Sequence, residues 1–192
     1  MQKLTKLLDI EISSSLSTEI EIVKSKYKYQ PELTKKLDAH IGDFTEITLL
    51  EIVLWKVNRY PTINQGLLTA INDLRKKYSE GKARGLLKML LDKKYKGFDL
   101  PMASTVLRFA CPDHLQIIDQ RVYRFITQYD SLKLPYSVDK KIDLYFKYIE
   151  ELKAASLKYG IDFKESDRIF YQLDKIHNKG IPLHKSHSEE NY

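Results

Sequence analysis

Apolar residues recur at spacings of three and four along most of this chain, which gathers them on one face of an α-helix. No segment shows the sustained alternation of apolar and polar residues that marks a half-buried strand. The pattern predicts an all-α protein of about eight to ten helices. At 192 residues, the chain is long enough for one domain or for two closely packed helical lobes.

The predicted helices begin and end at residues that favour helix termini: Ser, Thr, Asp or Pro at the start and Gly at the end. We expect helices near residues 17–29, 31–41, 45–60, 62–78, 80–94, 99–110 and 119–129, a long helix between Pro135 and Gly160, and a last one at 166–176. Residues 1–16 show no clear period, and residues 177–192 read as a polar, flexible tail.

The most apolar predicted helix lies between about Asp43 and Tyr60. Its apolar side chains cover nearly the whole circumference: Ile47, Leu49, Leu50, Ile52, Val53, Leu54, Trp55 and Val57. A helix that is apolar on all sides is normally buried on most of them. We therefore expect this helix to be the central element of the core.

Several classes of protein are disfavoured by composition. The chain has no apolar run long enough for a membrane span and no apolar stretch typical of a signal peptide near its start. Its single cysteine, Cys111, excludes an intramolecular disulfide and a metal site built from several cysteines. The five histidines have no spacing that indicates a metal site. We expect a cytoplasmic protein without a metal or a membrane partner.

The charge distribution favours an anionic partner. The net charge is +6, and six Lys or Arg residues between Lys82 and Lys96 face the single acid Asp92. This basic segment leads into a turn at Gly97, after which Asp99 can cap a short apolar helix. Two helices joined by a three-residue turn of this kind form a helix-hairpin-helix candidate. The backbone N–H groups at the start of the second helix can bind a phosphate.

A second motif follows this turn after a loop. It reads Ile118-Asp119-Gln120-Arg121-Val122-Tyr123-Arg124 and begins a predicted helix. Together, residues 96–124 resemble the helix-hairpin-helix superfamily of base-excision DNA glycosylases. In that family a Leu-Pro-Gly-Val-Gly hairpin is followed by Ala, which corresponds to Ala103, and then by an apolar-Asp-x-x-Val-x-Arg segment. The resemblance extends over roughly residues 43–176 and is specific only in residues 96–124.

The resemblance implies roles for individual residues. Asp119 takes the place of the catalytic aspartate, which stabilises the developing sugar cation and helps water to attack it. The residues expected to bind nucleic acid are Lys94, Lys96, Gly97, Phe98, Asp99, Arg121 and Arg124. The candidates for a base pocket are Trp55, Tyr60 and Tyr123. Duplex DNA is the partner that these roles imply, and residues 1–176 form one glycosylase-like domain with its hairpin near 82–110.

The chain departs from the family pattern at two hairpin positions. Asp99 stands where the family has its second hairpin glycine, and Pro101 lies at or near the lysine that bifunctional members use as a nucleophile. The four-cysteine iron–sulfur loop of some relatives is absent, so no cofactor is expected. The resemblance therefore implies a monofunctional enzyme or a non-catalytic relative.

Three alternatives remain open from the residues alone. Asp119 can act in catalysis or simply cap its helix. Arg121 and Arg124 can contact phosphates or form a salt-bridged face. The protein can be a glycosylase, a non-enzymatic helix-hairpin-helix module that binds DNA or a protein, or a helical scaffold with another task.

Overall fold

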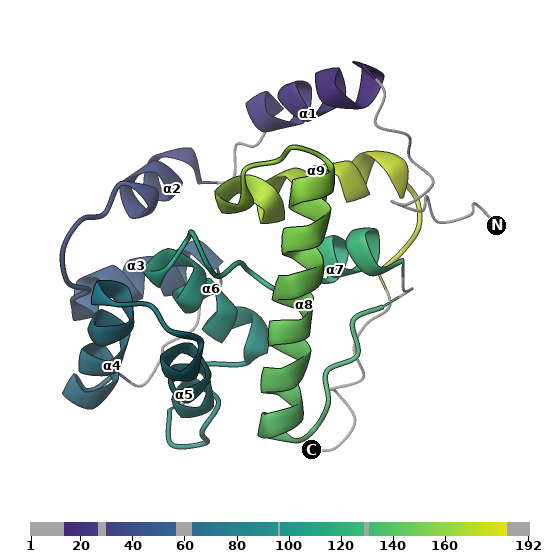
Figure 1. The fold of residues 1–192 in the computed structure, drawn as a ribbon. Coiled ribbons are helices and arrows are strands. Elements are labelled where there is room, and N and C mark those ends of the chain that lie inside the picture. Colours follow the sequence, from purple (N-terminus) through teal and green to yellow (C-terminus); the bar gives the residue numbers. More distant parts are fainter. Residues whose placement is uncertain (1–13, 27–29, 57–62, 96, 129–130, 184–192) are drawn as a thin grey trace. The chain divides into compact units, whose positions relative to one another are not determined.

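The computed structural model describes residues 14–26, 30–56, 63–95, 97–128 and 131–183. These residues form helices and connecting segments without a β-strand, which confirms the predicted all-α class for the described part of the chain. The helices are α1 (Ser14–Lys26), α2 (Pro31–Asp38), α3 (Glu46–Lys56), α4 (Gln65–Lys76), α5 (Glu80–Leu90), α6 (Leu100–Ala110), α7 (Gln120–Thr127), α8 (Val138–Lys158), the short 3₁₀ helix η2 (Phe163–Glu165) and α9 (Ser166–His177) (Figure 1).

The chain divides into two compact units. Unit 1 contains the described residues of Met1–Tyr27, Asp119–Tyr136 and Lys147–Tyr192, which include α1, α7 and α9. Unit 2 contains those of Lys28–Ile118 and Ser137–Phe146, which include α2 to α6. Helix α8 contributes its first residues to unit 2 and the remainder to unit 1.

The core of unit 2 is built on α6, which contacts α3, α4 and α5. Residues 102–110 of α6 are all buried, although they include polar side chains. The hydroxyl groups of Ser104 and Thr105 donate hydrogen bonds to the carbonyl oxygen of Pro101 (2.7 and 2.9 Å), which reduces the cost of burying them. Ser104 Oγ also accepts a hydrogen bond from the backbone N–H of Ile118. α6 is therefore the helix most enclosed by its neighbours in this unit.

The expectation that α3 would be buried on most sides is wrong. Leu49 and Ile52 are fully buried, but 68% of Ile47 and 58% of Leu54 are exposed. α3 packs against α2 and α6, and these two neighbours cover only part of its circumference. The apolar pattern located the helix correctly, but it could not show how many neighbours surround it.

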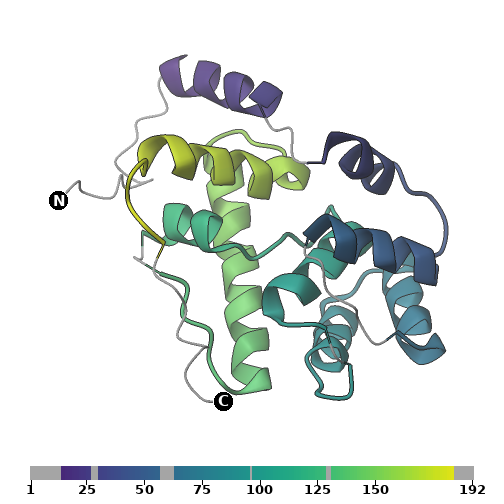
Figure 2. The ribbon, with the colours of Figure 1, turned by 180° about the vertical axis from the view of Figure 1, so that it is seen from behind.

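Unit 1 contains a three-helix arrangement in which α9 contacts both α1 and α7. Figure 1 and Figure 2 show α9 between these two helices. The rings of Phe125 on α7 and Phe170 on α9 lie 6.0 Å apart between centroids, and Tyr159 meets Phe170 edge-on. The buried contact between Phe125 and Phe170 packs the short helix α7 against α9.

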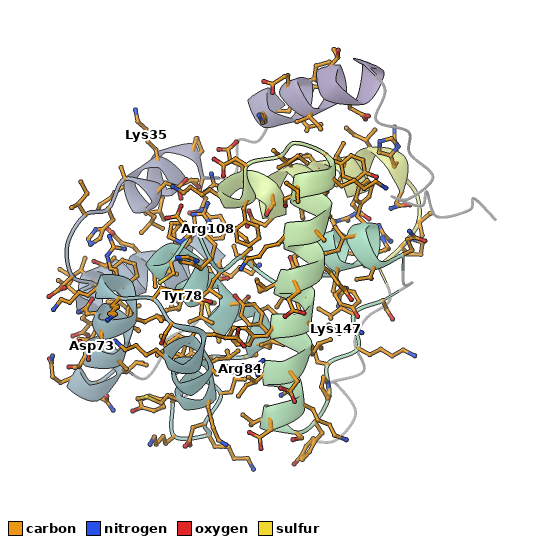
Figure 3. The ribbon with its side chains drawn as sticks, viewed as in Figure 1. Lys35, Asp73, Tyr78, Arg84, Arg108 and Lys147 are labelled. Atoms are coloured by element: carbon orange, nitrogen blue, oxygen red, sulfur yellow. The ribbon has the colours of Figure 1, made fainter. Side chains whose placement is uncertain are left out.

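The basic residues of α5 are partly neutralised by acids that are distant in sequence. Arg84, labelled in Figure 3, binds Glu80 (2.8 Å) and Asp143 (3.0 Å). Lys88 binds Asp139 (3.0 Å). Both aspartates belong to the first turns of α8, within the same unit. The local charge excess of residues 82–96 is therefore smaller in the folded unit than in the sequence.

Among the described residues, no helix combines the length and the apolar character that a membrane crossing requires.

Two matched substitutions on α3 test its one-sided burial. Leu49→Ala removes a fully buried side chain and is expected to lower the free energy of unfolding by about 2–5 kcal/mol. Leu54→Ala changes a side chain that is mostly exposed, so its effect is expected to stay within about 0.5 kcal/mol. Urea denaturation of both variants measures the difference. Equal losses at the two positions would show that α3 is buried on both faces.

Candidate functional site

The candidate site is the N-terminus of α7, where Asp119 is the N-cap residue. Its backbone is extended, with φ −125° and ψ 146°, and its carbonyl oxygen accepts the first helical hydrogen bond from Tyr123 N. The side-chain oxygen Oδ1 accepts hydrogen bonds from Arg121 N (2.8 Å) and Val122 N (3.4 Å). An Asp at this position satisfies helix N–H groups that have no partner within the helix. The capping interpretation of Asp119 is therefore confirmed.

Capping leaves part of the Asp119 carboxylate available. The side chain is only partly buried, and Oδ2 accepts no hydrogen bond from the described part of the chain. The two N–H groups that bind Oδ1 fix the orientation of the carboxylate. Oδ2 therefore has a defined position from which it can interact with a cation or with a water molecule.

Arg124 is part of a buried ion pair. Its Nε and Nη2 donate hydrogen bonds to Oδ1 and Oδ2 of Asp174 on α9, at 2.9 and 2.7 Å, and both side chains are 0% exposed. Nη1 also donates to the carbonyl oxygens of Ile181 (3.2 Å) and Pro182 (3.4 Å). The expected contact of Arg124 with a phosphate is therefore replaced by a structural role, because its guanidinium is used inside unit 1.

Arg121 lies one turn before Arg124 and shares the same carboxylate. Its Nη1 donates to Oδ2 of Asp174 at 3.2 Å, but 29% of its side chain remains exposed. Arg121 thus stands at the edge of the buried pair, with one end of its guanidinium anchored. Arg121 and Arg124 are the residues predicted to bind nucleic acid that belong to the same unit as Asp119. Arg121 is the nearer of the two in sequence.

Asp174 is a residue that the sequence analysis did not select. It also accepts a hydrogen bond from Nδ2 of Asn178 at 2.8 Å, so its two oxygens bind three side chains. A signal was present in the sequence: Asp174 follows Leu173 and lies four residues after Phe170, on the apolar face of a predicted helix. An acid on a buried face requires a cationic partner.

The predicted hairpin differs from the expected geometry. α5 ends at Leu90 and not near Lys94, so residues 91–99 connect it to α6 in place of a three-residue turn. Gly97 has φ +92°, a conformation that favours glycine. Asp99 is the N-cap of α6, and its Oδ1 accepts a hydrogen bond from Met102 N (3.0 Å).

The other residues of the predicted hairpin differ in their exposure. Lys94 is exposed, and its Nζ lies 3.9 Å from Asp92 Oδ2. Phe98 is partly buried, and Lys96 lies outside the described residues. The hairpin belongs to unit 2, whereas Asp119 and Arg121 belong to unit 1.

Two of the three base-pocket candidates lie in the described residues, one in each unit. Trp55 belongs to the core of unit 2, where Nε1 donates to Thr34 Oγ1 (2.6 Å) and the ring meets Phe109 edge-on. Tyr123 belongs to unit 1, is partly buried and stacks on Tyr148 with 6.3 Å between centroids. Tyr60 lies outside the described residues. Trp55 therefore has a packing role that the sequence pattern could not distinguish from a binding role.

Cys111 is buried at the C-terminus of α6, and its Sγ donates to the carbonyl oxygen of Leu74 at 3.5 Å. Burial raises the pKa of this thiol to about 11, although the nearby Arg75 opposes the shift. A protonated, buried thiol is a poor nucleophile. In the described ranges, no three side chains of His, Cys, Asp or Glu gather in a geometry that could hold a metal ion.

Replacing the buried carboxylate tests its structural role. Asp174→Asn leaves Arg124 buried without its counter-charge and is expected to lower the free energy of unfolding by about 3–5 kcal/mol. The control is Asp139→Asn, which removes the exposed partner of Lys88 and is expected to cost less than about 1 kcal/mol. Urea denaturation compares the two. Equal costs would show that the Arg124 pair contributes no more than a surface pair.

The raised pKa of Cys111 predicts a pH-dependent stability. The unfolded thiol has an ordinary value near 9.0, so the unfolded state releases its proton first as the pH rises. The stability of the wild type should therefore fall, relative to Cys111→Ala, between about pH 9 and pH 11. Urea denaturation across this range measures the difference. A thiol reagent should also react slowly with the native protein at pH 8 and rapidly in urea; rapid native labelling would contradict the prediction.

No protein-family model, no curated protein and no solved structure matches this chain.

Proposed function

We propose that the protein is a DNA glycosylase-like enzyme of the helix-hairpin-helix type that removes a damaged base from duplex DNA, with Asp119 as its catalytic carboxylate. The proposal rests on the resemblance of residues 96–124 to the base-excision glycosylases. One structural observation supports it above the others: Asp119 is held by Oδ1 at the start of α7, while Oδ2 accepts no hydrogen bond within the described residues.

This arrangement suits the chemistry of base release. When the bond between the base nitrogen and the sugar C1′ breaks, the base leaves with the bonding electrons and positive charge develops on the sugar. An oriented carboxylate stabilises that charge. Water then forms the new bond to C1′, its proton passes to the carboxylate and from there to the departed base, and the carboxylate is ionised again. Asp119 supplies the carboxylate oxygen for both steps.

The charges of the chain support a DNA partner. The net charge is +6, and the partly exposed Arg121 follows Asp119 by two residues. Lys93 and Lys94 are exposed in the segment between α5 and α6. Such cations bind phosphates without regard to base sequence. Binding should therefore weaken as the salt concentration rises.

A non-catalytic DNA-binding module is the alternative. One observation favours it: Asp119 and Asp99 are both engaged as helix caps, so neither requires a catalytic role to explain its presence. In this alternative the protein binds DNA in a salt-sensitive manner but releases no base.

The variant Asp119→Asn separates the two functions. Asn can still accept the two backbone hydrogen bonds through Oδ1, so the helix cap is kept while the negative charge is lost. The wild type should release a base from at least one duplex in a panel of deaminated, oxidised and alkylated bases. Strand cleavage by alkali after incubation reports the release. Asp119→Asn should be slower by about 100-fold or more.

The control is Asp162→Asn, which changes another Asp N-cap of unit 1, before η2. It should release the base at the wild-type rate. Base release by Asp119→Asn at the wild-type rate would exclude Asp119 as the catalytic group. Binding of the duplexes without release by the wild type would support the non-catalytic module.

A further inference from the structure

The ring of Tyr171 on α9 has two cations close to it. Arg121 Cζ on α7 lies 5.8 Å from the ring centroid, and Lys175 Nζ, one turn further along α9, lies 5.7 Å from it. Both distances are within the range in which a cation is attracted to an aromatic ring. Tyr171 is partly exposed and Lys175 is exposed, so this group reaches the surface of unit 1.

The acids of these two helices do not cancel the positive charge at this surface. α7 contains no Asp or Glu, and the two acids of α9, Asp167 and Asp174, are both buried. Asp174 already binds Arg124 and Arg121 together. One carboxylate thus faces two arginines, and Lys175 adds a further positive charge.

Arg121 is held in place before any partner binds. The hydrogen bond from Nη1 to Asp174 fixes one end of its guanidinium, and Asp174 is itself fixed by Arg124 and Asn178. A side chain that is already ordered loses less conformational entropy on binding. Lys175 is different: its only described contact here is with the ring, so it can move to a phosphate at low cost.

We propose that Arg121, Tyr171 and Lys175 form a binding surface for an unpaired nucleotide, with its base stacked on Tyr171 and its phosphates contacted by Arg121 and Lys175. An aromatic ring with one fixed and one mobile cation close to it is suited to binding unpaired nucleotides without sequence preference. An acidic peptide would use the cations but not the face of the ring. This inference rests on the proposed function in one respect. Arg121 lies two residues from Asp119, so a nucleotide bound here would lie near the proposed catalytic carboxylate.

The test uses DNA binding and does not depend on catalysis. The probe is a short duplex in which one unpaired 2-aminopurine bulges from one strand, and the reference is the same duplex fully paired. Tyr171→Leu should weaken binding of the bulged duplex by about tenfold, the effect expected for the loss of one stacked base, and should leave the paired duplex unchanged. Tyr171→Phe keeps the ring and should bind as the wild type does. Quenching of the 2-aminopurine fluorescence should accompany binding and disappear in Tyr171→Leu.

A matched aromatic and lysine pair serves as the control. Phe163 has Lys153 Nζ at 5.5 Å from its ring centroid in the same unit, but no arginine contact with its ring is described. Phe163→Leu and Lys153→Gln should leave binding of the bulged duplex unchanged, whereas Lys175→Gln should weaken it and reduce its salt dependence.

The outcomes distinguish this inference from the proposed function. Equal binding of the bulged duplex by wild type and Tyr171→Leu would overturn the binding surface, even if Asp119 proves catalytic. Complete displacement of the bulged duplex by polyglutamate at matched charge would also overturn it, in favour of an acidic peptide. Loss of binding in Tyr171→Leu together with a protein that releases no base would support the surface and exclude the enzyme.

Discussion

The buried pair of Arg124 and Asp174 is the interaction on which unit 1 depends. Moving two charges out of water is costly, and the cost is recovered only when both groups find close partners. Here the two side chains meet through two hydrogen bonds, while Asn178 and Arg121 occupy further positions on the carboxylate. Arg124 also binds the carbonyl oxygens of residues 181 and 182, so the pair joins α7, α9 and the segment after α9. If Asp174 is removed, Arg124 remains buried without a counter-charge, whereas removal of Arg124 leaves Asp174 only the contact with Arg121.

This pair explains why two arginines on one helix have different roles. Arg121 and Arg124 are three residues apart, so they lie near one another on α7 and can reach the same acid on α9. Arg124 points into the unit and is fully buried, whereas Arg121 reaches Asp174 from the edge and keeps 29% of its side chain exposed. The buried residue maintains the fold. The partly exposed residue combines a fixed orientation with access to solvent, which a binding residue requires.

The sequence predicted the helices well because their apolar spacing and their caps are local properties. The long helix before Gly160 and the last helix near residues 166–176 are confirmed as α8 and α9. The prediction that the helix before Gly97 extends to Lys94 was wrong: α5 ends at Leu90, although basic residues continue in the sequence to Lys94. Burial was less predictable: α6 carries Ser, Thr and Arg and is almost fully buried, whereas α3 has as many apolar residues and is partly exposed. Such differences depend on tertiary neighbours, which spacing along one helix does not reveal.

In the candidate site, too, the local sequence does not determine the role of a single residue. Asp99 and Asp119 are both Asp N-caps, and each binds the backbone of its own helix through Oδ1. The two residues therefore have the same local role, and helix capping alone assigns no further function to either. Their surroundings differ: the residue two positions after Asp119 is a fixed arginine, whereas the corresponding position after Asp99 is Pro101, which carries no charge. A cation close in the chain to a carboxylate can favour a phosphate-bearing substrate, because it attracts the phosphate that the carboxylate alone would repel. This difference is the physical reason why the proposed chemistry involves Asp119 and not Asp99.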